Sequence, residues 1–288
     1  MSARGGSLWS DAGRRLKKNR MAVASGWALI AVAALCMLAP WVPGLPGPNA
    51  TDFQLGVTGP AWRHWMGTDL LGRDMLARVI YGGRISILVG IVGTFVSVVI
   101  GVSYGAISAY AGGKVDEAMM RSVDVLYSLP YIFLVILLLT VFTKSLLLLF
   151  IALGAVQWLT MARIVRGQVL SLKHQNFVEA ARALGAGDLR IIFGHIVPNT
   201  LGPVIVYTTL TIPAIILQEA FLSFLGLGVQ PPDASWGVLV AEGAQMLAFF
   251  PWLTLFPGVA LALTLFAFNF LGDGLRDALD PQDRKVAA

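Results

Sequence analysis

Charged side chains are scarce in this sequence. Asp, Glu, Lys and Arg make up 13% of the 288 residues, whereas soluble domains carry about 25%. Apolar residues reach 57%, and the mean hydropathy is +0.74. This balance excludes an ordinary water-soluble domain and predicts an integral membrane protein.

Cysteine and histidine are also rare, and their scarcity excludes several kinds of site. The single cysteine, Cys36, rules out an intrachain disulfide and a cysteine-rich metal centre. His174 and His195 fall in one polar segment, His64 lies far from them, and no HExxH or similar metal-ligand spacing occurs. The chain also has no GxxxxGK[ST] sequence, so it cannot bind ATP through a P-loop.

Long apolar runs are what the chain has in abundance. A transmembrane helix needs about 20 such residues. Six runs approach or exceed that length, at residues 21–41, 85–110, 125–142, 146–162, 200–221 and 247–271. Only residues 143–145 separate the third run from the fourth, which predicts a tight helical hairpin. We therefore predict an all-α membrane protein with six transmembrane helices.

The basic residues predict how these helices are oriented. The net charge of +5 gathers in short clusters beside apolar runs, which is typical of the positive-inside rule and does not indicate a nucleic-acid partner. Six Lys and Arg in residues 1–20 place the N-terminus in the cytoplasm, and six crossings return the C-terminus there. Segment 163–198 is then cytoplasmic, whereas 222–246, which has no Lys or Arg, is outside. Residues 42–84 are also expected outside despite four arginines, because longer loops obey the rule less strictly.

The first apolar run has an alternative interpretation. The basic cluster before it resembles the start of a signal peptide, which would be cleaved. The run is longer than a typical signal-peptide core, and this favours an uncleaved first helix.

The outer segment and the chain ends set the predicted domain organisation. Residues 40–60 are rich in Pro, Gly and Asn and should be irregular, whereas 69–84 predict an amphipathic helix that lies along the membrane surface or caps the bundle. We expect one membrane domain over residues 64–281. Residues 1–63 supply the N-terminal tail, the first helix and the start of the outer segment, and 282–288 form a cytoplasmic tail.

The long polar interruption at residues 163–198 is predicted to be ordered. Residues 177–184 are strong helix formers, and Gly185 lies where a helix-ending residue in the left-handed conformation belongs. Asp188 is expected to cap a second helix over 189–195, and Pro198 to lie near the start of the next membrane helix.

The first of these helices carries an apolar stripe. Phe177, Ala180, Ala181 and Leu184 follow the 0, 3, 4, 7 spacing that puts side chains on one helical face. The small alanines would let a partner surface approach closely. Periodicity alone leaves two alternatives open, a helix packed under its own bundle and a helix that docks on a cytoplasmic partner.

The residues of this segment resemble the EAA loop of ABC-importer permeases. They are Glu179-Ala180-Ala181, Gly185 four residues after the second alanine, and Pro198 thirteen residues after that glycine. The family pattern ends in Ile-x-Leu-Pro, and this chain departs from it at His195 and Val197. The resemblance implies that the loop is a coupling helix that docks in a groove on a cytoplasmic ATPase, through Phe177, Glu179, Ala180, Ala181, Leu184, Gly185 and Pro198.

Other segments extend the resemblance to the peptide branch of that family. They lie at residues 64–74, 162–168, 221–232 and 272–281, so the likeness covers about residues 64–281. Segments 7–12, 112–116 and 158–163 are similar to the C-type permease subunits of oligopeptide transporters. Dipeptide, nickel and opine permeases share much of the remainder, so they stay open as alternatives.

The resemblance implies a fold, a location and a set of partners. The fold would be that of a type I ABC-importer permease in the bacterial cytoplasmic membrane, in contact with lipid. The chain would form half of a translocation pathway with a second homologous permease, and an extracytoplasmic binding protein would deliver the substrate. It would have no catalytic activity and no cofactor of its own, because two cytoplasmic ATPase subunits would bind ATP and Mg.

Glu219 is the one acid within the predicted spans, near the outer end of the fifth. A charge at membrane depth is expensive and often functional, so Glu219 is a candidate for the substrate path, where it could attract a peptide amino terminus. The alternative is an interfacial carboxylate that reaches water or a backbone N–H.

Two other classes of protein fit the sequence less well than a transport subunit. An intramembrane enzyme would need a Ser–His pair or paired acids at membrane depth, and the predicted spans contain no histidine. A secondary transporter usually shows inverted repeats and intramembrane charges, and neither is evident here.

Overall fold

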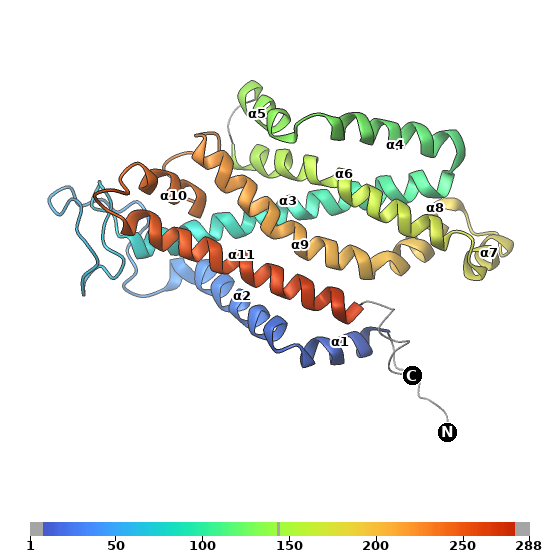
Figure 1. The fold of residues 1–288 in the computed structure, drawn as a ribbon, viewed down its shortest axis with the longest axis horizontal. Coiled ribbons are helices and arrows are strands. Elements are labelled where there is room, and N and C mark those ends of the chain that lie inside the picture. The colour runs from blue at the N-terminus through green and yellow to red at the C-terminus, as the bar shows by residue number, and fades with distance from the viewer. Residues whose placement is uncertain (1–7, 143–144, 280–288) are drawn as a thin grey trace.

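The protein is an elongated bundle of helices in a computed structural model that describes residues 8–142 and 145–279 (Figure 1). Among these residues, five helices are long and apolar enough to cross a membrane. They are α2 (Arg20–Leu38), α3 (Met75–Ala111), α6 (Leu146–Leu172), α9 (Val197–Phe224) and α11 (Trp252–Leu279). Helices α4 (Gly113–Ser128) and α5 (Tyr131–Val141) give a sixth span only if they are counted together, across an 84° bend.

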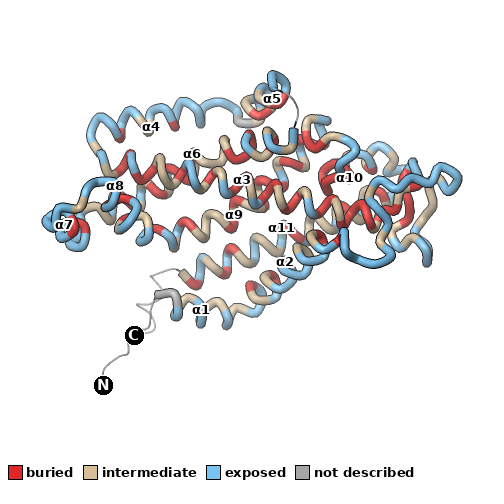
Figure 2. The backbone as a smooth tube through the Cα atoms, turned by 180° about the vertical axis from the view of Figure 1, so that it is seen from behind, coloured by how far each residue is buried: buried red, intermediate tan, exposed pale blue. Residues whose placement is uncertain are grey.

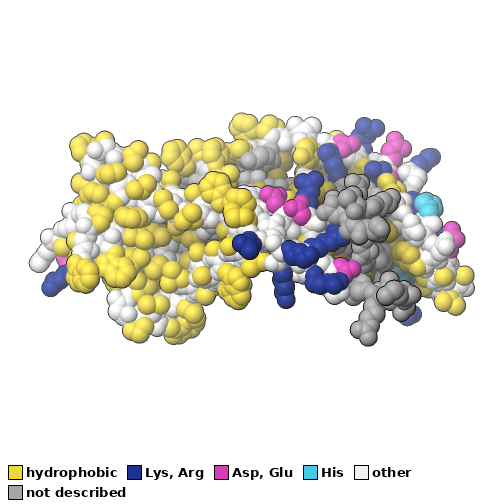
Figure 3. Space-filling model, turned by 60° about the horizontal axis from the view of Figure 1, so that its bottom comes forward, with side chains coloured by type: hydrophobic (Ala, Val, Ile, Leu, Met, Phe, Trp, Pro, Cys, Tyr) yellow, Lys and Arg dark blue, Asp and Glu magenta, His cyan; other side chains and the backbone are white. Residues whose placement is uncertain are grey.

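Shorter elements lie at the two ends of the bundle. Helices α7 (Asn176–Ala183) and α8 (Asp188–Ile191) lie at one end, which we call the α7 end (Figure 1). Residues 42–74 and α10 (Trp236–Ala244) lie at the other, the α10 end. Helix α1 (Leu8–Lys18) packs beside the last turns of α11. Figure 3 shows a face on which hydrophobic side chains cover most of the length, while charged side chains gather toward the α7 end.

Helices α3, α6 and α9 form the centre of the bundle, where Figure 2 shows most of the buried positions. The α3–α6 contact is close because both helices place glycines in it. A Cβ on Gly154 would lie 2.6 Å from the carbonyl oxygen of Gly93, and a Cβ on Gly101 would lie 2.6 Å from the Cβ of Met161. Small residues permit such backbone approach between membrane helices, and the packing they allow holds the pair together.

Helix α3 begins ten residues before the predicted second span, so the prediction of a surface helix over 69–84 is wrong. Residues 75–84 are turns of α3 and most of them are buried, and the carboxylate of Asp74 caps the helix by accepting a hydrogen bond from Ala77 N at 2.9 Å. Arg78 is only 2% exposed there, and it pairs with two carboxylates. Hydropathy could not anticipate this extension, because it scores a paired arginine as a charge.

Helix α6 likewise continues ten residues beyond the predicted fourth span. Its added turns carry Arg163 and Arg166, which pair with Asp124 and Asp116 of α4 at 2.8 and 2.6 Å. The polar interruption therefore begins near Lys173, at the end of α6, and not at residue 163.

The predicted third span, 125–142, is not one helix. It breaks at Leu129, whose ψ of 135° is extended, because the following Pro130 disfavours a helical conformation in the residue before it. Only the eleven residues of α5 form the helix that follows the break, and all but Thr140 and Tyr131 are aliphatic or Phe. Residues 143 and 144 of the predicted hairpin turn lie outside the described residues, although α5 does pack against α6.

The chain between the last two spans also differs from the prediction. Residues 247–251 form turns, so the final helix is α11 from Trp252 to Leu279. Before it lies α10, which was not predicted; the hydroxyl of Ser235 caps this helix by accepting a hydrogen bond from Val238 N at 3.1 Å. Residues 42–60 are turns and loops, as their Pro, Gly and Asn content predicts.

Candidate functional site

The α7 end carries the helix–glycine–helix element that the sequence predicts. Helix α7 ends with Leu184 as its cap, and Gly185 follows with φ of +80°. Ala186 N donates to Ala181 O at 3.1 Å and Gly185 N donates to Arg182 O at 3.0 Å. These two bonds make a Schellman motif, which satisfies carbonyls that a helix end leaves free. The prediction of a helix closed by a left-handed glycine is confirmed.

The second helix differs in detail from the prediction. Gly187 is the N-cap of α8, and Asp188 is its first residue; the Asp188 carboxylate accepts a hydrogen bond from the hydroxyl of Tyr110 at 2.9 Å instead of capping the helix. Helix α8 then runs through a π-helical turn, η2 (Ile192–Ile196), directly into α9. His195, one of the two departures from the family pattern, lies in this turn. Pro198 occupies the first turn of α9, as predicted.

The apolar stripe of α7 is divided between two faces. Ala181 is 8% exposed and packs inward with Val178, which is fully buried. They join a core cluster with Val165, Val169, Ile191 and Ile196. Sequence reasoning missed Val178, although its position three residues before Ala181 gave the signal.

The other members of the stripe face outward. Phe177 is 38% exposed, Leu184 is 88% exposed and Ala180 is also exposed. Within the described part of this chain nothing covers the Leu184 side chain. The helix thus packs under its own bundle through one face and presents a second, partly apolar face.

Tyr110, at the end of α3, links the two short helices. Its hydroxyl donates to Asp188 and accepts a hydrogen bond from Arg182 Nη2 at 3.2 Å. The hydrogen bond with the Tyr110 hydroxyl, together with the negative charges of Asp188 and Glu179, raises the pKa of Arg182 above its ordinary value. Lys173 Nζ donates to the carbonyl of Ala109 at 2.8 Å. The α7 element is therefore tied to α3 on both sides.

Helix α4 is fastened to the same end of the bundle by Asp116. Its carboxylate accepts hydrogen bonds from Ser108 of α3 at 2.6 Å and from Arg166 Nε and Nη2 of α6 at 2.7 and 2.6 Å. This bidentate pair gives geometric specificity as well as energy. Sequence reasoning missed it, because the partners are 50 residues apart.

Glu219 lies inside the bundle and is 0% exposed. Its Oε1 accepts hydrogen bonds from Ser223 at 2.6 Å and from Ser235 at 2.7 Å, whereas its buried Oε2 has no partner among the residues that the structure describes. The carboxylate therefore joins α9 to the cap of α10. This differs from the interfacial alternative, since the side chain lies inside the bundle and accepts its hydrogen bonds from two hydroxyl groups. A role in the substrate path stays a prediction.

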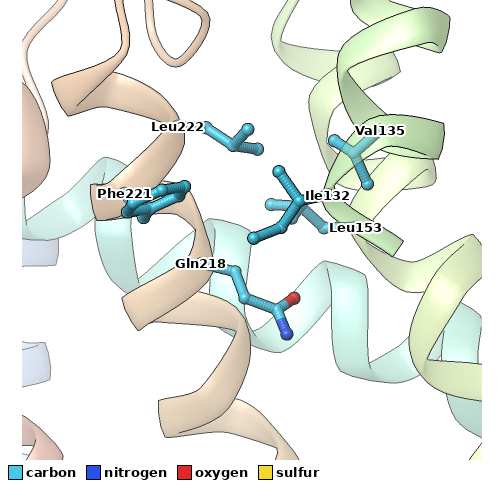
Figure 4. A pocket seen from close by; sticks show the side chains of 6 residues that line it. All are labelled: Ile132, Val135, Leu153, Gln218, Phe221 and Leu222. Atoms are coloured by element: carbon cyan, nitrogen blue, oxygen red, sulfur yellow. The ribbon is translucent and has the colours of Figure 1, made fainter. Parts of the chain in front are cut away.

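A small pocket lies between α5, α6 and α9 (Figure 4). Gln218 gives it one polar group, and the buried amide oxygen of Gln218 has no hydrogen-bond partner in the described part of the chain. The remaining lining is apolar, from Ile132, Val135, Leu153, Phe221 and Leu222. Its volume of about 10 Å³ is about that of one water, so no peptide-sized passage is open there. Among the described residues, no group of three or more His, Cys, Asp and Glu could hold a metal ion.

Comparisons with known proteins agree with the helical architecture. Residues 77–285 match the family described as binding-protein-dependent transport system inner membrane component, and residues 7–54 match the N-terminal transmembrane domain of oligopeptide transport permease C. A solved inward-facing structure of the MetNI methionine ABC transporter covers 72% of this chain and 98% of its own, with a TM-score of 0.59 and 18% identity. At that identity the likeness shows the fold alone, which is that of a type I ABC-importer permease.

Curated relatives match over nearly the whole chain. The oligopeptide transport system permease protein OppC of Haemophilus influenzae is 52% identical over 286 residues, which are 99% of this chain and 92% of that protein. OppC of Escherichia coli K12 is 51% identical, with 99% and 94% covered. The dipeptide permease DppC of Bacillus subtilis is 45% identical, with 97% and 87% covered. The chain therefore belongs to the family of inner membrane components of binding-protein-dependent transport systems, the ABC-importer permeases.

Proposed function

We propose that this chain is the permease subunit of an ATP-driven importer of oligopeptides in the bacterial cytoplasmic membrane. Relatives named as oligopeptide permeases, 51% and 52% identical over 99% of the chain, support this substrate class. The dipeptide permease at 45% identity keeps dipeptides as an alternative, with nickel and opines as further members of the same branch. A second homologous permease would complete the translocation pathway.

The proposed topology has six crossings with both termini in the cytoplasm. The bent pair α4–α5 would be the third crossing, since it runs from the α7 end toward the α10 end (Figure 1). The basic residues of α1 and the α7 element lie toward the same end of the bundle, which supports a cytoplasmic α7 end under the positive-inside rule.

The proposed coupling surface is the outward face of α7, with Glu179 beside it. The observation that carries the proposal is the combination of an 88% exposed Leu184 with a rigid support, the buried pair Val178 and Ala181. An exposed apolar side chain on a fixed helix fits insertion into a groove on a partner protein. Two cytoplasmic ATPases would bind ATP and Mg, and their closure would move α7 and, through η2, the membrane helix α9. An extracytoplasmic protein would deliver the peptide.

A substitution of Leu184 tests this coupling. We expect Leu184→Glu to insert and fold normally, because the 88% exposed side chain has little packing to lose against the described residues. The assembled complex should nevertheless lose substrate-stimulated ATP hydrolysis, since a charge would enter an apolar groove. Leu184→Met is the matched control and should retain stimulation. Normal stimulation in the Glu variant would count against docking through this face.

Uptake by the reconstituted complex tests the substrate class. Proteoliposomes with the permease pair, the ATPases and the binding protein should accumulate a labelled oligopeptide only when ATP is present. Competition by excess unlabelled oligopeptide, dipeptide or nickel identifies the preferred cargo. Uptake of nickel or dipeptide without oligopeptide would overturn the oligopeptide assignment but not the permease role.

A further inference from the structure

A cluster of cations marks the corner between α1 and α2. Its members are Arg14, Arg15, Lys17, Lys18 and Arg20. Residues 10–20 contain one acid, Asp11, and Arg14 pairs with it. Lys17, Lys18 and Arg20 are exposed and form no ion pair within the described part of the chain. The corner therefore carries cationic groups that the described chain does not neutralise.

Packing against α11 holds this corner in a fixed position. Asn19 is the only residue between α1 and α2, and its side chain caps α2 by accepting a hydrogen bond from Ala22 N at 3.1 Å. A Cβ on Gly274 of α11 would overlap the Cβ of Ala22 and would lie 3.4 Å from Leu16 Cδ1. Ala22 is accordingly 0% exposed. The cations are therefore carried by a closely packed support and not by a loose tail.

The length of α2 places the corner at the boundary of the membrane. Helix α2 has 19 residues, which span about 28 Å, and the hydrocarbon core of a bilayer is about 30 Å thick. Trp41, which is 74% exposed, follows the far end of the helix, and tryptophan favours the headgroup level. Arg20 at the near end then lies at the level of the lipid phosphates. Figure 3 shows Lys and Arg side chains gathered where the hydrophobic cover of the bundle ends.

The outward side of α2 continues from the cations into the apolar part of the membrane. Its exposed members are Arg20, Ala24, Trp27, Ala31 and Leu35, whose spacing puts them on one side of the helix. Trp27 is 68% exposed and Leu35 is 49% exposed, so both offer apolar surface outside the bundle. A phospholipid can therefore place its phosphate at the corner and its acyl chains along this side of α2.

The excess of positive charge selects an anionic lipid. Asp273 and Asp277 are exposed on the neighbouring turns of α11, but Arg276 lies between them, so cations remain in excess at the corner. Arginine binds phosphate through two parallel hydrogen bonds, and lysine binds it as a point charge. A zwitterionic headgroup adds a cation of its own, which these side chains repel. Each lysine or arginine near an anionic lipid surface strengthens binding about fivefold.

We propose that the α1–α2 corner is a binding site for the headgroup of an anionic phospholipid. Lys17, Lys18 and Arg20 bind the phosphate, and the acyl chains lie along the outward side of α2. The bound lipid stabilises the contact of α1 and α2 with the end of α11. The proposal rests on the proposed topology only for the leaflet, which is the cytoplasmic one. It depends on neither the cargo nor the ATPases.

The test measures lipid binding to the assembled transporter in mild detergent, by native mass spectrometry and by the thermal midpoint. The probes are phosphatidylglycerol and phosphatidylcholine with the same acyl chains. Phosphatidylglycerol should bind more tightly and raise the midpoint. The double variant Lys17→Gln, Lys18→Gln should weaken phosphatidylglycerol binding about 25-fold and leave phosphatidylcholine binding unchanged. Arg20→Gln should weaken it about fivefold, and this single variant serves if the double variant does not fold.

The matched control is the double variant Lys114→Gln, Arg121→Gln, which removes two exposed cations from α4. It should bind phosphatidylglycerol as the wild type does. Equal losses in the two double variants would mean diffuse attraction to surface charge and would overturn the site, as would unchanged binding in the Lys17 and Lys18 variant. If glycerol 3-phosphate raised the midpoint as much as the lipid, the corner would bind a soluble anion, which also overturns the proposal. Binding is measured without cargo or ATP, so a failed uptake assay would refute the proposed function and leave this site standing.

Discussion

Replacing Gly185 should uncouple the transporter by loosening the end of α7. The glycine has φ of +80°, and a Cβ built on it would meet nothing within 4 Å. The energetic penalty of a substitution is therefore conformational and not steric contact with neighbours. An L-residue in this region costs about 1–3 kcal/mol, with asparagine at the low end and β-branched residues at the high end.

The size of the effect follows from the shortness of the helix. Helix α7 has eight residues, and its end depends on the two Schellman hydrogen bonds made by Gly185 N and Ala186 N. A penalty of about 3 kcal/mol in Gly185→Val raises the population of the opened helix end about 100-fold. Gly185→Asn should remain close to the wild type, because asparagine tolerates the left-handed conformation. The opened population in Gly185→Ala should lie between those of the Asn and Val variants.

Two measurements on the assembled complex check this series. Amide hydrogen exchange of α7 should quicken in the order Asn, Ala, Val, and substrate-stimulated ATP hydrolysis should fall in the same order while insertion stays normal. The reasoning is refuted if Gly185→Val exchanges and hydrolyses like the wild type. It is equally refuted if the Asn variant is as impaired as the Val variant, since the loss would then not follow backbone conformation.

Three further substitutions test the packing and the buried acid. Gly154→Val should lower the thermal midpoint in detergent, because overpacking against a carbonyl oxygen 2.6 Å away costs about 1–3 kcal/mol. Gly167→Val on the same helix, where a Cβ would meet nothing within 4 Å, should leave the midpoint unchanged. Equal midpoints for the two variants would contradict close α3–α6 packing. Asp116→Asn should destabilise the bundle, because it weakens the ion pair with Arg166. In a double-mutant cycle of thermal stability, the combined Asp116→Asn and Arg166→Gln variant should lose less stability than the sum of the two single variants. Strict additivity would mean that the pair does not fasten α4. Glu219→Gln keeps the side-chain volume and an oxygen acceptor, so normal expression is expected together with altered kinetics of peptide uptake; unchanged kinetics at normal expression would remove Glu219 from the substrate path.

Much of the architecture could be predicted because apolar length and polar interruption are local signals. The cores of five spans and the helix–glycine–helix element follow from hydropathy and helix-ending chemistry alone. Hydropathy misplaced the ends of α3 and α6, since Arg78, Arg163 and Arg166 are charges whose partners lie on other helices. Such pairings depend on the three-dimensional arrangement of the helices, which a single sequence does not reveal.

The broken third span and the surface of α7 illustrate two other limits. Pro130 was visible in the sequence, but averaged hydropathy ignores a single proline that ends a helix. The stripe on α7 was correctly identified as apolar, yet only the fold shows that Ala181 turns inward with Val178 while Leu184 turns outward. Residues of one apolar stripe can lie on both a buried and an exposed face of the helix when they are spread over a wide arc.

Site-specific cross-linking at Leu184 tests the central claim, that the outward face of α7 docks on a cytoplasmic ATPase. The chain's one cysteine, Cys36, is buried, so Leu184→Cys introduces a readily accessible thiol. Trp62→Cys, at a 91% exposed position of the α10 end, is the matched control. With a short bifunctional reagent carrying a photoreactive group, the account predicts a cross-link from position 184 to the co-purified ATPase and none from position 62. An ATPase cross-link from position 62, or none from position 184 in an active complex, would contradict it.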